Sequence, residues 1–227
     1  MNCIDIFYNE NRSPCSLIQP VQHSMFIRPS TANEVTIIIR EPESNKSPGP
    51  DNIPIKLVKC PCSKFSVILS KVFNQIVSCG VYPDCLKIAK VTPVFKACDS
   101  SDPSNYRPIS SLSVFSKIRE KLYILLEFLA RNNVIYNLQY GFRRGCGTTT
   151  AITELVDSII NELEKKQIVG ALFLDLKKSS DTLDHCILLR KLNCYGIRGI
   201  ANDILRTYLS KRQKLFKFLI REVRFRI

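Results

Sequence analysis

The sequence predicts an α+β fold, and three observations support this class. Apolar residues recur at helical spacing over residues 55–79 and 148–165, which is typical of amphipathic helices. Alternating or continuous apolar runs over residues 89–96 and 168–176 predict strands. Hydrophobic residues make up 45% of the 227 residues, enough for a sizeable core. Since no clear linker separates these elements, we expect one body of mixed helices and strands.

The N-terminal residues differ from the rest of the chain. Residues 1–23 show no periodicity and predict an irregular segment, followed by one folded region over residues 24–227. Thr31 is followed three residues later by Glu34, the pattern of a capping box at a helix start. We expect that helix to run to about Ile39.

Further helices are expected in the first half of the chain. The pattern over residues 55–79 predicts two helices broken near Pro61 and ended by Gly80, because glycine commonly follows the last helical turn. Residues 99–108 are polar and predict a turn. Residues 115–130 predict one long helix.

The second half begins with its most distinctive strand. Residues 168–176 are almost continuously apolar and predict a strand buried on both faces. Residues 181–195 predict a helix closed by Gly196, and residues 205–227 predict a helix followed by a strand.

Composition narrows the class of protein. The ten cysteines are scattered without a Cys-x-x-Cys pair, and only two histidines are present, which disfavours structural zinc and favours reduced thiols in an intracellular protein, whether nuclear or cytoplasmic. No apolar run reaches the roughly 18 to 20 residues of a membrane span. We therefore expect no membrane partner.

The charge points to a polyanionic partner. The formal net charge is +13, and residues 177–227 carry thirteen Lys or Arg against four acids. Such a surface favours phosphate contacts with nucleic acid, although a basic protein without that role has the same composition.

One carboxylate stands out. Asp175 follows the apolar run at the point where the predicted strand meets its turn. A carboxylate there requires a cation or hydrogen bonds to offset its burial. A divalent metal is one such partner, and a helix-capping or salt-bridged Asp is the alternative.

Seven sequence blocks, in order, resemble those of reverse transcriptases from non-LTR retrotransposons, the jockey-like LINE elements. The resemblance covers roughly residues 24 to 215. The blocks read KSPGPDNIP (46–54), KIAKVTPVFK (87–96), NYRPIS (105–110), QYGFR with TTTA (139–151), FLDLKK with DTLDH (173–185), YGIRG (195–199) and YLSKRQ (208–213).

The resemblance implies the fingers and partial palm of a right-hand polymerase, an incomplete domain whose activity is RNA-directed DNA polymerisation. It implies that Asp175 is catalytic and holds Mg²⁺, and that Arg107, Lys90 and Ser180 contact the incoming nucleotide. Lys96 flanks the same strand as Lys90 and could also face nucleotide or template.

The resemblance also assigns a template contact. It implies that the template is bound by Gly141, Phe142 and Arg143. The implied partners are an RNA template, a DNA primer and deoxynucleoside triphosphates.

Two departures from the family pattern change the expectation of activity. Ser180 stands where the family has an aromatic residue that excludes a 2′-hydroxyl, so selection of deoxynucleotides is in doubt. The family's Y-x-D-D hairpin is missing, and no Asp-Asp pair occurs in the chain. We therefore expect a truncated fragment that is inactive alone; the alternative is a non-catalytic, basic nucleic-acid-binding remnant of a decayed mobile element.

Overall fold

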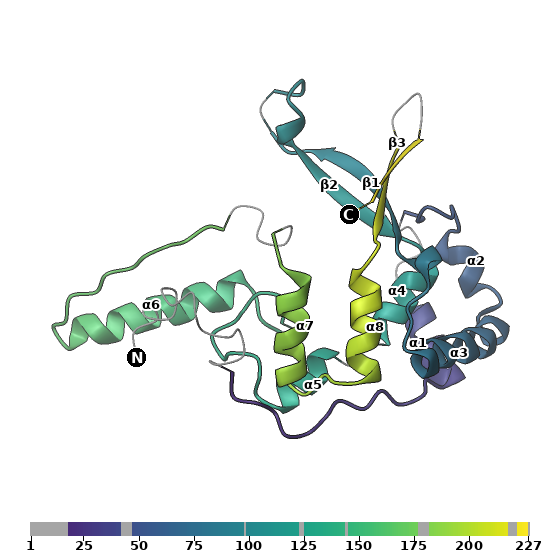
Figure 1. Cartoon of the computed structure of the whole chain (residues 1–227). Coiled ribbons are helices and arrows are strands. Elements are labelled where there is room, and N and C mark those ends of the chain that lie inside the picture. Colours follow the sequence, from purple (N-terminus) through teal and green to yellow (C-terminus); the bar gives the residue numbers. More distant parts are fainter. Residues whose placement is uncertain are drawn as a thin grey trace. The chain divides into compact units, whose positions relative to one another are not determined.

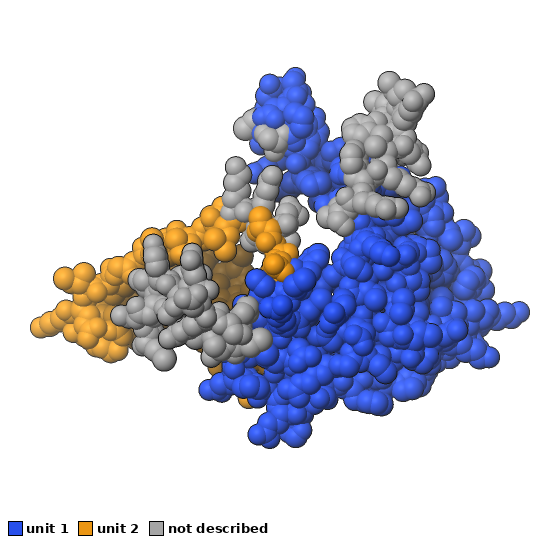
Figure 2. Space-filling model, in the orientation of Figure 1, with its two compact units in different colours: residues 1–125, 185–227 blue, residues 126–184 orange. Residues whose placement is uncertain are grey.

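The fold is described from a computed structural model. It has two compact units, one formed by residues 1–125 with 185–227 and the other by residues 126–184 (Figure 2). The structure describes residues 18–41, 47–97, 99–122, 125–143, 145–176, 182–217 and 222–226.

The first helix, α1 (Ala32–Arg40), begins with the predicted capping box. The Thr31 hydroxyl accepts a hydrogen bond from the Glu34 amide at 3.3 Å, and the Glu34 carboxylate accepts one from the Thr31 amide at 2.9 Å. That backbone hydrogen bond, together with the neighbouring Arg28 guanidinium, lowers the pKa of Glu34. The prediction of this helix and of its cap is confirmed.

The next two helices, α2 (Ile55–Lys59) and α3 (Cys62–Cys79), are separated at Pro61 as predicted. Gly80 ends α3 in the left-handed conformation with φ of 68°, and its amide donates to two carbonyls of the last turn. A short 3₁₀ turn, η2 (Asp84–Leu86), then leads into the sheet.

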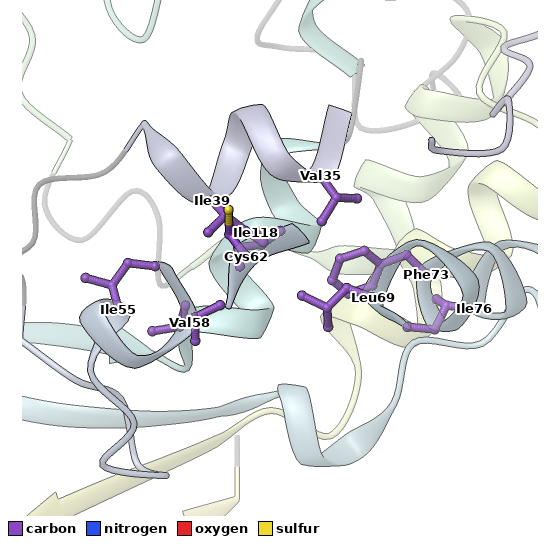
Figure 3. Close-up of a cluster of buried hydrophobic side chains, with 10 residues drawn as sticks. Val35, Ile39, Ile55, Val58, Cys62, Leu69, Phe73, Ile76 and Ile118 are labelled. Atoms are coloured by element: carbon purple, nitrogen blue, oxygen red, sulfur yellow. The ribbon is translucent and has the colours of Figure 1, made fainter. Parts of the chain in front are cut away.

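Four helices of the first unit share one hydrophobic core (Figure 3). Side chains from α1 and α3 pack against Ile118 of α4 (Val114–Lys121). The fully or nearly fully buried members are Val35, Ile39, Ile55, Val58, Cys62, Leu69, Phe73, Ile76, Val114 and Ile118.

Four strands of the first unit form one sheet in the order β2-β1-β3-β4. Figure 1 labels β2, β1 and β3. The strands are β1 (Ile88–Phe95), β2 (Tyr106–Leu112), β3 (Gln213–Lys217) and β4 (Glu222–Arg226). β1 pairs antiparallel with β2 and parallel with β3, and β3 pairs antiparallel with β4. The strand predicted over residues 89–96 is confirmed.

Two helices precede β3. α7 (His185–Cys194) is shorter than the helix predicted over residues 181–195, and Gly196 follows it with φ of 90°. α8 (Ile200–Leu209) leads into β3 and β4, so the helix predicted from residue 205 begins earlier, and the single strand predicted after it is two strands.

The helix predicted over residues 115–130 is two helices in the structure. The Leu122 amide bonds to the carbonyl of Arg119, three residues back, which tightens and closes the last turn of α4. α5 spans Leu125–Arg131. The prediction of one continuous helix was wrong.

In the second unit, α6 (Thr148–Glu164) matches the predicted helix. Its apolar face is solvent-exposed in the structure, and none of its residues is buried. No helix among the described residues is long and apolar enough to cross a membrane.

The strand predicted over residues 168–176 is absent. The segment is unpaired and its apolar side chains are exposed, Phe173 at 80% and Leu174 at 79%. A strand buried on both faces must pair within a sheet whose two faces are both covered, and the four described strands pair with one another instead. The prediction of a buried strand was therefore wrong.

Candidate functional site

The hairpin of β1 and β2 carries two of the predicted nucleotide contacts, Lys90 and Arg107, and its connecting loop is cross-linked by hydrogen bonds. The Asn105 side chain donates to the carbonyl of Asp99 at 2.8 Å, and the Tyr106 hydroxyl donates to the carbonyl of Ser100 at 2.9 Å. The Tyr106 ring packs against Phe95 with centroids 5.4 Å apart. These contacts fix the end of the ladder at which Arg107 lies.

Arg107 lies inside a strand rather than in the turn expected over residues 99–108. It is exposed and pairs with Val94 in the β1–β2 register. The expected polar turn ends at Asn105, because Tyr106–Leu112 form β2, in which Pro108 is paired with Pro93. Neither proline has an amide to donate, so they can share a position without hydrogen bonds in an antiparallel ladder.

The strand order explains why both prolines are tolerated. β2 is the edge strand, and β1 pairs with β3 only over Ile88 to Val91, short of Pro93. No strand among the described residues pairs with either proline on the side away from the hairpin partner, so the lack of an N–H group there breaks no hydrogen bond of the sheet.

Lys90 and Arg107 lie on the same face of the ladder. Lys90 pairs with Ser111, and the Thr92–Ile109 pair lies between this position and the Val94–Arg107 pair. Side chains alternate between faces with a period of two, so these three pairs point to one side. Lys90 is half-buried. Lys96 is exposed just after β1, and its amide donates to the Asn105 carbonyl at 2.8 Å.

The loop of the KSPGPDNIP block packs against the end of this hairpin. Gly49 is buried, and a Cβ built there would lie 2.6 Å from both the amide nitrogen and the Cα of Ser113. Ser113 is the N-cap of α4, where its hydroxyl accepts a hydrogen bond from the Ser116 amide at 3.1 Å. Only glycine lets this loop approach the junction of β2 and α4 so closely.

The YLSKRQ block anchors the start of β3. The Tyr208 hydroxyl donates to the Glu120 carboxylate at 2.6 Å, and its ring packs edge-on against Tyr82 with centroids 5.0 Å apart. The Arg212 guanidinium lies 4.5 Å from the Tyr208 ring centroid. Burial, and then the hydrogen bond to Glu120, raise the pKa of Tyr208.

A second tyrosine extends this anchor. The Ser116 hydroxyl donates to the Leu86 carbonyl at 2.7 Å, so it accepts the hydrogen bond from the Tyr82 hydroxyl at 3.0 Å. The Tyr82 amide donates to the hydroxyl of Thr207 at 2.9 Å. These contacts connect α8 with α4 and η2, and they were missed at the sequence level because no local spacing signals such distant pairs.

The predicted template contacts lie together on one loop of the second unit. Phe142 is 98% exposed with φ of 60°, and Gly141 beside it is exposed. Arg143 is half-buried, and its Nη1 atom donates to backbone carbonyls of the same loop. The three residues are adjacent, but the ring and the guanidinium have different surroundings.

Asp175 is exposed and lies in the unpaired extended segment. Asp175 was expected at the end of a paired strand, and this expected position was wrong. Ser180 and Asp181 lie outside the described residues.

The predicted Mg²⁺ site requires more ligands than the structure gathers. Among the described residues, no three Asp, Glu, His or Cys side chains lie close enough to hold a metal ion. Two-metal catalysis needs several anionic ligands, and Asp175 alone does not match that donor set. We therefore derive no reaction step through a metal ion.

Known proteins similar to this chain come from the family that its sequence blocks resemble. A family model described as reverse transcriptase (RNA-dependent DNA polymerase) matches residues 93–225. Among curated proteins, the chain is 28% identical over 215 residues to a probable RNA-directed DNA polymerase from transposon BS of Drosophila melanogaster, covering 91% of this chain and 22% of the relative.

A second relative is the RNA-directed DNA polymerase from mobile element jockey of Drosophila funebris, 30% identical over 180 residues, covering 78% of this chain and 20% of the relative. The chain thus spans about a fifth of the length of the curated relatives it matches. The expected likeness to non-LTR retrotransposon polymerases is confirmed.

Proposed function

This chain belongs to the reverse transcriptase (RNA-dependent DNA polymerase) family, and from that premise we propose that it is the template- and nucleotide-binding part of an RNA-directed DNA polymerase. In this proposal it corresponds to the fingers and the first part of the palm. Its partners are an RNA template, a DNA primer and deoxynucleoside triphosphates, and its template contacts include Gly141, Phe142 and Arg143.

The observation that carries the proposal is the placement of Lys90 and Arg107 on one face of the β1–β2 ladder. They are four strand positions apart, about 13 Å at roughly 3.3 Å per residue. A triphosphate is an extended polyanion, and the planar guanidinium of Arg107 suits two of its oxygens at once. Ser180 is assigned to the same nucleotide by resemblance alone.

The surroundings of this face support the assignment. Arg107 is exposed on an edge strand, so a phosphate can approach it from solvent. The loop at the hairpin end is held by hydrogen bonds from Asn105 and Tyr106, which reduces the ordering that binding would otherwise require.

The test is direct binding of a deoxynucleoside triphosphate by isothermal titration calorimetry. We expect Arg107→Gln to weaken binding about 10- to 150-fold, since hydrogen bonds to charged groups contribute about 1.5 to 3 kcal/mol. Lys90→Gln should weaken it less. Lys71→Gln, which removes an exposed lysine from α3, is the matched control and should change nothing.

The non-catalytic alternative makes a different prediction for the same titration. A basic remnant that binds polyanions without a nucleotide site would lose no more affinity with Arg107→Gln than with Lys71→Gln. That result would count against the nucleotide-binding role.

A further inference from the structure

The loop between α5 and α6 exposes three large apolar side chains. Tyr136, Leu138 and Phe142 are 72%, 57% and 98% exposed. Phe142 also has φ of 60°, a region that a bulky residue rarely occupies. The Phe142 ring is solvent-exposed, so packing within its own unit does not offset the cost of this backbone conformation. Such strain persists where the surrounding structure enforces it, commonly at a binding site.

Arg143 is one of the groups that enforce this conformation. Its Nη1 atom donates to the carbonyls of Tyr136 at 3.3 Å, Asn137 at 2.9 Å and Gln139 at 3.4 Å. The guanidinium is therefore turned into the loop, where it donates to backbone carbonyls outside the helices and strands; the Tyr136 carbonyl also accepts a hydrogen bond from the Gln139 amide at 3.0 Å.

A second contact ties the loop to α6. The Tyr140 hydroxyl donates to the carboxylate of Glu154, which raises the pKa of Tyr140 to about 12. The Gln139 side chain also donates to the Gly141 carbonyl at 3.4 Å. The loop on either side of Phe142 is thus held by hydrogen bonds, while the Phe142 side chain itself is exposed.

We infer that Phe142 is a stacking platform for a base of single-stranded nucleic acid, and that Arg143 is a positioning residue that holds the platform rather than a ligand of template phosphate. This inference rests on the proposed function and divides its template contact between two roles. Aromatic rings stack on bases of any identity, provided that the base faces are unpaired and accessible. The unit that holds this loop, residues 126–184, carries seven Lys or Arg against eight acids, so the contact is expected to depend on the ring and not on net charge.

The first test measures binding of a fluorescein-labelled single-stranded RNA of mixed sequence by anisotropy. Phe142→Leu keeps an apolar side chain but removes the ring, and we expect affinity to fall about 5- to 150-fold. Phe142→Trp should bind at least as well as the unchanged chain. Leu126→Ala, which truncates an exposed apolar residue in the same unit, is the control and should have no effect.

A duplex of the same sequence provides the comparison. Its base faces are covered, so Phe142→Leu should change duplex affinity little. Equal affinity of Phe142→Leu and the unchanged chain for single-stranded RNA would overturn the inference and assign the ring to a protein partner. Failure of the unchanged chain to bind RNA at low salt would instead contradict the proposed function itself.

The second test separates positioning from phosphate binding at Arg143. A phosphate ligand contributes about 0.7 to the slope of log affinity against log salt on single strands. Arg143→Gln removes the charge together with the planar group shared among the loop carbonyls. We expect it to weaken binding as much as Phe142→Leu does, with an unchanged slope. A slope smaller by about 0.7, or full affinity, in Arg143→Gln would overturn the positioning role.

Discussion

Lys90 and Arg107 lie on the same face of the β1–β2 ladder, with only the Thr92–Ile109 pair between their register positions. Their placement depends on the Pro93–Pro108 pair, which occupies a position on the opposite face without an amide on either strand. β2 is the edge strand, so the face that carries both cations is bordered by solvent on that side. Arg107 of the NYRPIS block is thus an exposed strand residue, whereas a turn had been predicted.

Gly49 is predicted to be intolerant of any side chain. Gly49→Ala places a Cβ 2.6 Å from backbone atoms of Ser113, and backbone cannot move aside as a flexible side chain can. We expect the free energy of unfolding to fall by about 1 to 3 kcal/mol, the usual cost of overpacking. Urea unfolding followed by circular dichroism measures this. Gly170→Ala, with no atom within 4 Å of its Cβ, should be neutral, and equal stabilities of the two variants would contradict the packing argument.

The Tyr208–Glu120 hydrogen bond is predicted to make stability depend on alkaline pH. The pKa of Tyr208 is raised from its ordinary 10.0 by burial and by that hydrogen bond. Above pH 10 the unfolded chain has lost a proton that the folded chain keeps, so the free energy of unfolding falls as pH rises. Tyr208→Phe should lower stability at neutral pH by about 1 to 3 kcal/mol, because Glu120 loses its donor.

The control for this prediction is the slope of stability against pH. Tyr208→Phe should flatten the alkaline decline only in part, since burial raises the pKa of Tyr82 as well. An alkaline decline as steep as that of the unchanged chain would show that Tyr208 does not titrate as described.

Local signals predicted most of the helices correctly. The capping box at Thr31, the break at Pro61 and the left-handed Gly80 depend on neighbours within a few residues, so sequence alone identifies them. Lys90 and Arg107 were assigned from their sequence blocks, and their contact with a nucleotide stays a prediction.

The errors came from long-range structure. An apolar run predicts a strand only if other strands pair with it, and residues 168–176 have none among the described residues. The contacts of Gly49 with Ser113 and of Tyr208 with Glu120 join residues far apart in the chain. No periodicity or spacing reveals them before the fold is known.

The chain is predicted to bind RNA without sequence preference and in a strongly salt-dependent manner. Its net charge of +13 favours release of counterions from phosphates, and non-specific dissociation constants are roughly 10⁻⁴ to 10⁻⁶ M at physiological salt. Fluorescence anisotropy over a salt series measures the slope. An affinity that is insensitive to salt would mean that contacts other than phosphate dominate.

The 227-residue chain is predicted not to extend a primer on an RNA template. Asp175 is exposed, and no group of three metal-ligating side chains forms among the described residues. Two-metal catalysis requires the ions about 3.5 to 4 Å apart, which several anionic ligands must stabilise. The assay uses Mg²⁺ or Mn²⁺ and compares the chain with Asp175→Ala. Templated extension that disappears in that variant would contradict the prediction.

The most direct measurement is photolabelling with a photoreactive deoxynucleoside triphosphate, followed by mass spectrometry of the labelled peptides. The nucleotide-binding role of Lys90 and Arg107 predicts adducts within residues 88–112, competed by unlabelled triphosphate but not by the nucleoside. Arg107→Gln should reduce this labelling strongly, whereas Lys71→Gln should not. Adducts confined to the α2–α3 surface, or labelling unchanged by Arg107→Gln, would contradict the proposal that this hairpin holds the incoming nucleotide.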